Sequence, residues 1–359
     1  MISSILKAYG IPSHDCTVEP LVSGLINKTL KISTGNQVYI LQRINNNVFK
    51  SPKDIAENIR MIDKYLKLNN PDYLFVSPVR NLQNEELVHD PVEGYFRLFP
   101  FIIGTHTINV VTSPDQAFEA ALQFGKFTRL LSGFDSSKLH NTIPDFHNLS
   151  LRHIQFEDSL KGGDPDRIKQ AKPLIDDLKE YRHILNTFER IQKNKCIKKR
   201  VTHHDTKISN VLFDDQEKGV AVIDLDTVMA GYFISDMGDM MRTYLSPANE
   251  EERDFSKIEV REDYFHAIVH GYIQYMGDEL TEEEHDLILY SGLFLIYMQA
   301  IRFLADHCNK DSYYGASYEG QNFVRAGNQI CLLKKLAEKE NLLQGIIHKE
   351  LQSRSRLLS

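Results

Sequence analysis

The chain has 359 residues, of which 42% are hydrophobic and 25% are charged, and its formal net charge is −7. This composition is ordinary for a globular protein, and the length suggests two domains or lobes that each bury a core. Because the net charge is negative and no long basic run occurs, we do not expect nucleic acid as a main partner.

The N-terminal sequence MISSILKAYGIPSHD lacks the basic region, long apolar run and small-residue cleavage site of a secretory signal. No stretch approaches the roughly 20 apolar residues that span a bilayer, and the most apolar segment, residues 287–304, is interrupted by polar side chains. The four cysteines are far apart and fit neither a disulfide framework nor a zinc site. The sequence therefore predicts a cytoplasmic protein with no membrane segment and no evident obligatory protein partner.

Residues 1–103 have the pattern of strands with one helix. The helix is predicted over 54–68, with Ser51 as its N-cap, Pro52 in its first turn and an apolar stripe at helical spacing. β-prone runs predict strands at 18–22, 28–33, 38–44, 87–89 and 95–103.

From residue 105 onward the pattern is mostly helical. Apolar residues at helical spacing predict helices over 114–131, 150–160 and 167–191, and a helical tail over 323–358. We therefore expect an α+β chain of two lobes, a β-rich one at 1–103 and a helical one at 104–359.

The most informative stretch is VTHHDTKISNVLFDDQEKGVAVIDLD, residues 201–226. Asp205 is followed five residues later by Asn210, and two short strands at 210–213 and 220–223 lead to Asp224. One carboxylate can orient and deprotonate an attacking hydroxyl, while an amide oxygen and a second carboxylate hold magnesium on nucleotide phosphates. The pattern therefore indicates metal-assisted phosphoryl transfer.

HHDTKISNVLFD, followed by AVIDLDTVMAGY, resembles the catalytic loop and metal-binding aspartate of the aminoglycoside phosphotransferase/choline kinase family. Its spelling is most similar to that of the N-acetylhexosamine 1-kinases within that family. The resemblance implies a bilobal protein-kinase-like fold, ATP and Mg²⁺ as cofactors, and a small-molecule sugar whose anomeric hydroxyl accepts the phosphoryl group.

Roles within the loop follow from this resemblance. Asp205 would be the base or orienting carboxylate, and Lys207 would stabilise charge on the transferred group. Asn210 and Asp224 would hold magnesium, and Asp226 would either bind a second metal or support the first.

Three neighbouring residues are expected to have other roles. We expect His203 to fix the loop rather than to move protons. Asp236 resembles a family aspartate that braces the loop, whereas Asp239 is predicted to face solvent. Only nine residues separate Asp226 from Asp236, which leaves no room for the long segment on which a protein kinase docks a polypeptide.

In the first lobe the resemblance implies a nucleotide site. The turn that contains Ser23, Gly24 and Asn27 would cover the phosphates, because glycine lets the backbone approach closely. Gln42 stands where most kinases of this fold have a phosphate-binding lysine, with Arg43 beside it. Alternation sends these two neighbours to opposite faces, and the sequence does not decide which of them replaces the lysine.

Two further elements of this lobe are implied in nucleotide binding. Glu57 is the candidate for the helix carboxylate that kinases pair with the strand cation, and the alternative is a solvated side chain. The backbone around Phe101 and Ile102 resembles the hinge that hydrogen-bonds adenine.

On the acceptor side, the stretch RFLADHCNKDSYY resembles hexosamine-kinase sequence, and Arg302 and Tyr313 are the candidate sugar contacts. Such groups suit sugar hydroxyls and an acetamido carbonyl better than an amine. The alternatives are a kinase of another small alcohol, of aminoglycoside, choline or homoserine type, and a nucleotide-binding scaffold that has lost catalysis. The sequence does not separate N-acetylglucosamine from N-acetylgalactosamine.

Overall fold

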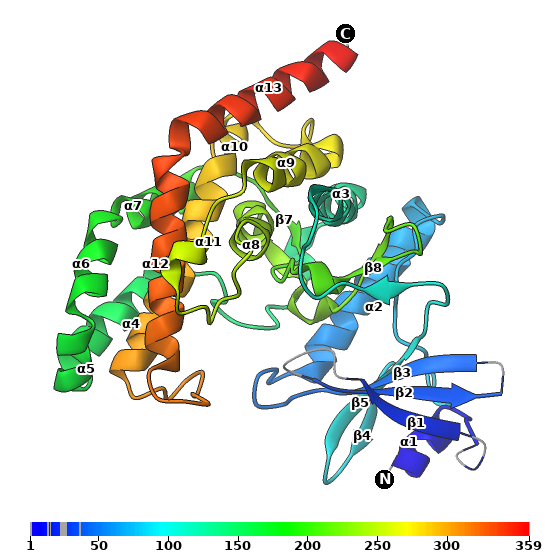
Figure 1. Cartoon of the computed structure of the whole chain (residues 1–359). Helices are drawn as coiled ribbons and strands as arrows, with labels where there is room; N and C mark the ends of the chain where they lie inside the picture. The colour runs from blue at the N-terminus through cyan, green and yellow to red at the C-terminus, as the bar shows by residue number, and fades with distance from the viewer. Residues whose placement is uncertain (1, 13, 15, 22–26, 36, 359) are drawn as a thin grey trace.

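The computed structural model describes residues 2–12, 14, 16–21, 27–35 and 37–358. An antiparallel sheet with strand order β1-β2-β3-β5-β4 forms the small lobe (Figure 1). Its elements are α1 (Ile2–Ala8), β1 (Cys16–Leu21), β2 (Lys28–Thr34), β3 (Gln37–Arg43), α2 (Pro52–Asn69), β4 (Val88–Asp90) and β5 (Gly94–Pro100).

Helix α1 was not predicted, so the described part of the small lobe has two helices where the sequence suggested one. Its buried side chains Ile5 and Leu6 join Leu41 and Leu98 in an apolar cluster against the sheet. With 7 residues, α1 is too short for a helical period to stand out, and its formation depends on this packing.

Helix α2 buries the predicted stripe of Ile55, Ile59, Ile62 and Leu66. These side chains belong to the core of the larger lobe and not to the cluster beneath the sheet. The helix begins at Pro52, and Ser51 precedes it without making a side-chain cap.

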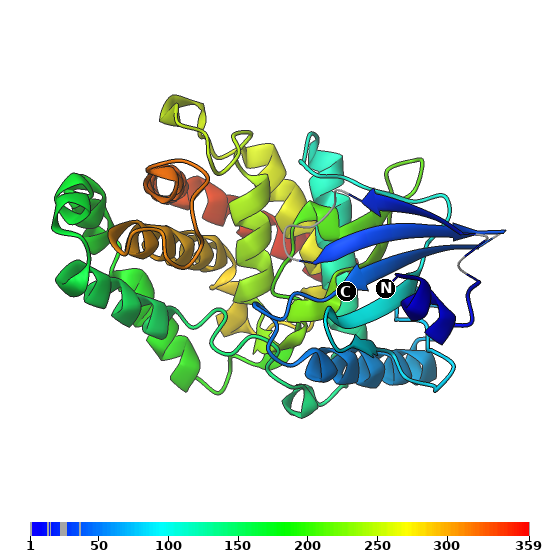
Figure 2. The same cartoon turned by 90° about the horizontal axis from the view of Figure 1, so that it is seen from below.

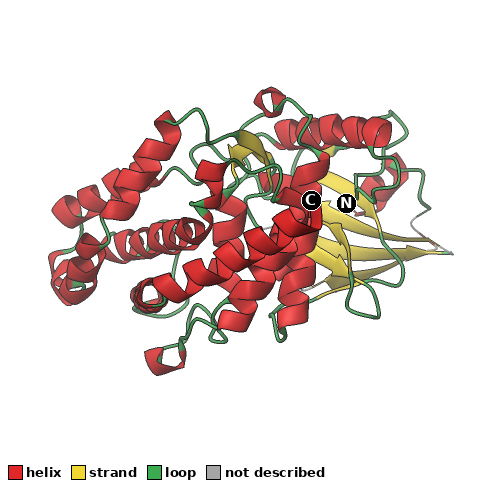
Figure 3. Cartoon of the chain, turned by 90° about the horizontal axis from the view of Figure 1, so that it is seen from above, coloured by secondary structure: helices red, strands yellow, loops and turns green. Residues whose placement is uncertain are grey.

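The larger lobe is mainly helical (Figure 3). Its helices are α3 (Pro114–Leu130), α4 (Leu149–Gly162), α5 (Pro165–Gln170), α6 (Lys172–Glu180), α7 (His183–Lys193), α8 (Ile234–Tyr244), α9 (Glu262–Met276), α10 (Glu282–His285), α11 (Ile288–Cys308), α12 (Gln321–Glu338) and α13 (Glu340–Leu358). The expected helical stretch at 167–191 is thus three helices, and the tail is two.

Among the described residues, α11 alone is long and apolar enough to cross a bilayer by length and composition. The sequence analysis expected no such stretch. In the structure 78% of its most apolar window is buried inside the protein, and the helix packs on α4, α7, α8 and α12. This is the position of a core helix.

Two small sheets lie where the lobes meet, and the loop at 203–210 connects them. One pairs β7 (Lys199–Thr202) with β10 (Met229–Tyr232), and the other has the order β6-β8-β9. Strand β6 is His106–Thr107, β8 is Val211–Phe213 and β9 is Gly219–Val222. Seen from below, the five-stranded sheet fans out on one side and the helices fill the other (Figure 2), which confirms the predicted α+β arrangement of a small β-rich and a larger helical part.

Candidate active site

The catalytic loop joins β7 to β8 and is fixed by the first turn of α8. Asp236 is buried, and its two carboxylate oxygens accept the backbone N–H groups of His203 (3.0 Å) and His204 (2.7 Å). The Thr206 hydroxyl donates to the Asp236 carbonyl at 2.8 Å. Asp236 therefore braces the loop, as predicted.

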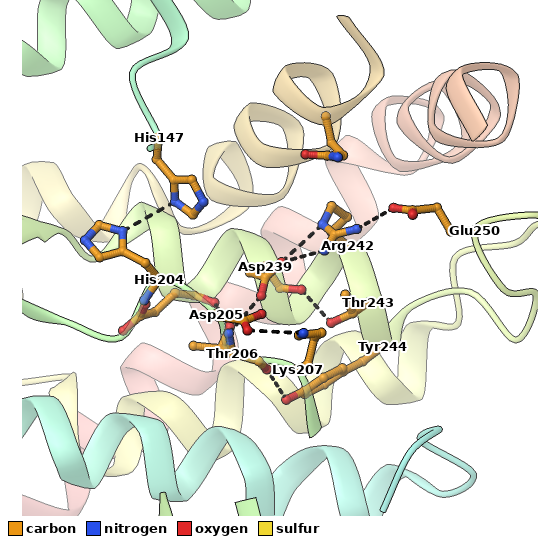
Figure 4. A network of polar contacts seen from close by, with 12 residues as sticks. His147, His204, Asp205, Thr206, Lys207, Asp239, Arg242, Thr243, Tyr244 and Glu250 are labelled. Atoms are coloured by element: carbon orange, nitrogen blue, oxygen red, sulfur yellow. Dashed lines mark hydrogen bonds and ion pairs between the residues drawn. The ribbon is translucent and has the colours of Figure 1, made fainter. Parts of the chain in front are cut away.

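Asp239 does not face solvent, and that prediction was wrong. One oxygen accepts the N–H of Thr206 at 2.8 Å, and the other accepts Nε and Nη2 of Arg242 at 3.1 and 2.9 Å (Figure 4). Burial raises the pKa of Asp239, and the Arg242 charge opposes that rise. Asp236 and Asp239 are three residues apart and so share one helix face, which lets both hold the loop.

Asp205 lies at the centre of this loop. Its Oδ2 accepts Nδ2 of Asn210 at 3.1 Å, and Lys207 Nζ lies 3.1 Å from the same oxygen. Burial lowers the pKa of Lys207, but Asp205 and nearby carboxylates outweigh it, so the net shift is upward. Lys207 therefore stays protonated beside Asp205, with its side chain 39% exposed.

His203 is buried and links the loop to the strand that leads to Asp224. Its Nε2 lies 3.0 Å from the Ile223 carbonyl, and its backbone carbonyl accepts the Thr227 hydroxyl at 2.7 Å. Burial lowers its pKa. These contacts agree with the predicted fixing role.

Asp224 lies in a crowded anionic corner. Burial, then the charges of Asp226 and Asp205, raise its pKa to about 7. Its carboxylate has no hydrogen-bond or ion-pair partner among the residues that the structure describes. Its backbone is left-handed (φ 60°), a strained conformation for a non-glycine residue that is often kept at functional sites.

The neighbouring strands bring Asn210 to this corner, because the Ile223 N–H donates to the Asn210 carbonyl at 2.9 Å. Asn210 uses Nδ2 for its contacts with Asp205, which leaves its amide oxygen for a cation. Hard oxygen donors and crowded negative charge fit a divalent ion such as Mg²⁺.

Asp226 is buried and engaged from the small lobe. Its Oδ2 accepts Nδ2 of Asn27 at 2.7 Å, and its Oδ1 lies 2.5 Å from Nη1 of Arg97. Oδ2 thus accepts a hydrogen bond, whereas Oδ1 is ion-paired with Arg97 but accepts no hydrogen bond from the described residues. The sequence analysis did not single out Arg97, although a lone charge inside the apolar strand YFRLFPF was a signal.

The structure separates Gln42 from Arg43, as alternation requires. Gln42 lies opposite Arg97 in the sheet, and its Oε1 accepts Nε and Nη2 of Arg97 at 3.0 and 2.8 Å. Arg43 pairs with Glu93, with Nη1 2.5 Å from Oε2. Arg43 is thus 40% exposed and away from Asp226.

Glu57 does not pair with a strand cation, which corrects the kinase-like expectation. Its carboxylate contacts Arg60 at 3.3 Å and His140 at 3.1 Å, and its side chain is 44% exposed. Arg97, on the neighbouring strand β5, forms its ion pair with Asp226 and not with Glu57.

Ser23 and Gly24 lie outside the described residues. In the predicted hinge, the Phe101 N–H donates to the Val38 carbonyl at 3.0 Å, and the Ile102 carbonyl accepts the Thr105 hydroxyl at 2.7 Å. These two backbone groups are therefore already used, and an adenine would have to meet others in the segment.

Arg302 and Tyr313 border one cavity of about 440 Å³ between α4, α11 and the loop after α11. The Arg302 guanidinium lies 5.8 Å from the ring of Tyr313 and 5.3 Å from that of Tyr314. The cavity also contains Arg152, which the sequence analysis missed because α4 places it there from a distant part of the chain. Neither guanidinium forms an ion pair with a carboxylate of the described residues.

His147 connects this cavity electrostatically with the catalytic loop. Its Nδ1 lies 3.4 Å from Nδ1 of His204, the residue before Asp205 (Figure 4). Burial, then the charges of His204 and Arg302, keep its pKa well below the usual range. His147 is therefore influenced both by the loop that contains Asp205 and by a guanidinium that borders the cavity.

A small antiparallel lobe, a helical lobe and a loop that groups Asp205, Asn210 and Asp224 define a kinase-type phosphotransferase. A model of the phosphotransferase enzyme family (APH) matches residues 17–269. This chain belongs to that family and is a small-molecule phosphotransferase.

Solved structures of kinase-type enzymes share the fold over nearly the whole chain. A microcompartment-associated aminopropanol kinase has a TM-score of 0.63 at 15% identity, covering 96% of this chain and 98% of that one. A spectinomycin phosphotransferase, solved with ADP and spectinomycin, has 0.60 at 13%, covering 94% and 97%. A choline kinase from Cryptosporidium parvum has 0.57 at 16%, covering 96% of both.

Proposed function

We propose that this phosphotransferase transfers the terminal phosphoryl group of ATP, with Mg²⁺, to the anomeric hydroxyl of an N-acetylhexosamine. Bound at Asn210 and Asp224, the metal would offset phosphate charge. Asp205 orients the acceptor hydroxyl and takes its proton, and Asn210 fixes the carboxylate. Lys207, protonated beside Asp205, adds positive charge next to the reacting group. A spectinomycin phosphotransferase of this fold was solved with ADP, and an amicoumacin kinase with AMP-PNP and Ca²⁺, which supports a nucleotide and a divalent ion.

The observation that carries the acceptor class is the pair of guanidinium groups at the cavity, which have no ion-pair partner among the described residues. Arg152 and Arg302 both border the cavity, while the two carboxylates of its lining contact other groups: Asp158 lies 3.6 Å from Lys161, and Asp306 accepts the N–H groups of Tyr313 and Tyr314. Burial, then the charge of Arg302, lowers the pKa of Arg152, so the two cations repel each other. An aminoglycoside or choline would add positive charge to this surface, whereas hydroxyl and acetamido oxygens accept hydrogen bonds from guanidinium groups.

Acceptor preference is tested by measuring ADP release with N-acetylglucosamine, N-acetylgalactosamine, an aminoglycoside, choline and homoserine, and by locating the phosphate in the product by ³¹P NMR. We expect the hexosamines to give the highest kcat/KM and a phosphate on C1. A higher kcat/KM for a cationic acceptor would refute the sugar assignment while leaving the phosphotransferase reaction intact.

Asp205→Asn tests the catalytic assignment. Asparagine keeps the size and one acceptor oxygen but cannot take the proton, so kcat should fall by about 10²- to 10⁴-fold while Mg²⁺–ADP still binds. If ATP binds while no acceptor raises turnover, and Asp205→Asn changes nothing measurable, the alternative of a nucleotide-binding scaffold is favoured. The expectations of a cytoplasmic protein without nucleic-acid, membrane or obligatory protein partners stay predictions.

A further inference from the structure

Gln42, a neutral residue, occupies the β3 position where most kinases of this fold carry a lysine. A positive charge is nevertheless present beside it, on Arg97 of β5. Gln42 is paired in register with Arg97 on β5 and with Thr29 on β2. The three side chains form one polar row across the sheet, because directly opposed residues point to the same face. Arg97 is 2% exposed, so the cation stands in a dry position at the inner end of this row.

The guanidinium of Arg97 is held on two sides. Gln42 accepts two of its N–H groups, and Gln42 Nε2 lies 3.4 Å from the Thr29 hydroxyl. Asp226 lies 2.5 Å from Nη1 through its Oδ1, and its Oδ2 accepts a hydrogen bond from Asn27. The charge is therefore fixed between Gln42 of the sheet and Asp226.

A guanidinium has more N–H donors than these contacts use, and it binds phosphate oxygens in a planar, bidentate way. Arg97 is ion-paired with Asp226, which follows the proposed metal ligand Asp224 by two residues. The cation thus lies beside the segment that would hold the metal and, with it, the phosphates of the nucleotide. Arg43 cannot do this, because Glu93 holds it on the other face.

We propose that Arg97 is the phosphate-binding cation of this enzyme, with Gln42 and Asp226 as its positioning residues. Gln42 on β3 thus positions the guanidinium of Arg97, which comes from β5. Asp226 then orients Arg97 and is not itself a metal ligand. This inference rests on the proposed ATP-dependent function.

The test compares Arg97→Gln, Arg97→Lys and the double variant Gln42→Lys/Arg97→Gln, which returns the cation to β3. Binding of Mg²⁺–ADP is measured by calorimetry, and KM for ATP and for the sugar by ADP release. Arg97→Gln should weaken ADP binding and raise KM for ATP by about 10- to 100-fold, the range for hydrogen bonds to a charged group. KM for the sugar should not change, Arg97→Lys should be intermediate, and the double variant should regain affinity.

Arg200→Gln is the matched control. Arg200 forms a buried ion pair with Glu284 at 2.6 Å and also donates to the Glu279 carbonyl, so its printed side-chain partners include no residue assigned to the nucleotide or the metal. It should lose thermal stability without changing the affinity for Mg²⁺–ADP. If Arg97→Gln, or Arg97→Lys should the glutamine variant not fold, binds Mg²⁺–ADP as tightly as the wild type, Arg97 is only structural and the inference fails.

Asp226→Asn separates positioning from metal binding. We expect a moderate loss of ADP affinity with the Mg²⁺ requirement unchanged, whereas a large rise in the Mg²⁺ concentration needed for turnover would overturn the positioning role. If the wild-type protein itself binds no Mg²⁺–ADP, the proposed function fails and not merely this assignment.

Discussion

His204 combines a strained backbone with a buried ring. Its φ is 67°, in the left-handed region that few non-glycine residues adopt, although histidine is enriched there together with asparagine and aspartate. Burial, then the charge of His203, lowers its pKa to about 3. The ring packs directly on Gly231 of β10, because a Cβ at that position would come within 2.4 Å of the His204 ring.

His204 should make the protein sensitive to acid. Its pKa is 6.5 in the unfolded chain and about 3 when folded, so between these values the unfolded state binds the extra proton and stability falls as pH drops. From pH 6.5 to about pH 5 the loss is on the order of 2 kcal/mol. His204→Asn, which tolerates this backbone, should flatten the dependence by that amount in denaturant titrations.

The control for this experiment is His89→Asn, because His89 is exposed on β4. It should keep the wild-type pH dependence. Equal acid sensitivity of His204→Asn and the wild type would show that the ring of His204 is not the group that titrates.

At this scale the sequence indicated residues whose roles depend on local spacing. Asp205, Asn210 and Asp224 lie on one loop and the strands next to it, so the motif itself brings them together. Arg97 was missed because its role depends on the register between β3 and β5, and a strand reveals its partner only in the sheet. The buried state of Asp239 depends likewise on Thr206, which is 33 positions away.

Helices α3 and α9 form a close contact in the larger lobe, and each provides a glycine at the crossing. A Cβ at Gly125 would lie 2.7 Å from the Tyr272 carbonyl oxygen, and one at Gly271 would lie 2.4 Å from that of Phe118. Both obstacles are backbone atoms, which cannot move without shifting a helix. Since α3 also packs on β9 and β7, this crossing sets the distance between the helical core and the catalytic strands.

Gly271→Ala should therefore destabilise the protein although alanine is the better helix former. The propensity gain is about 1 kcal/mol, while overpacking costs about 1–3 kcal/mol, and a backbone obstacle places the cost at the upper end. We expect a net loss of about 1–2 kcal/mol in thermal or chemical unfolding. Gly345→Ala on α13 is the matched control, since nothing lies within 4 Å of its Cβ, and it should stabilise slightly. A Gly271→Ala variant as stable as Gly345→Ala would contradict the close crossing.

Element types could be predicted from periodicity, and several element ends could not. The break between α5 and α6 had a signal in Pro173, which lies in the first turn of α6. The break between α12 and α13 at Lys339 has neither proline nor glycine to mark it. The chain turns there because α13 packs on α9 and α11. Tertiary contacts decided the second case, and sequence patterns do not contain them.

At the scale of the whole molecule, α2 belongs to the small lobe by sequence and to the large lobe by packing. Its apolar stripe lies in the larger core, and the predicted division at residues 103 and 104 stays a prediction. The polar link is Asn58, which is fully buried and donates to the carbonyls of His140 (2.9 Å) and Val228 (3.1 Å). Val228 follows Asp224 by four residues, so the helix of one lobe holds the segment of the other that we propose to bind the metal.

Asn58→Leu should weaken both the fold and nucleotide binding. Leucine has a similar size but removes the hydrogen bonds to the His140 backbone and leaves the Val228 carbonyl buried without its Asn58 partner, at a cost of about 1–3 kcal/mol. Because the segment after Asp224 then loses its anchor, the rise in melting temperature on adding Mg²⁺–ADP should also shrink. Asn69→Leu at the exposed end of the same helix, where Asn69 bonds only its own helix, should change stability by no more than about 0.5 kcal/mol. If the two variants melt together and respond equally to Mg²⁺–ADP, α2 does not couple the lobes through Asn58.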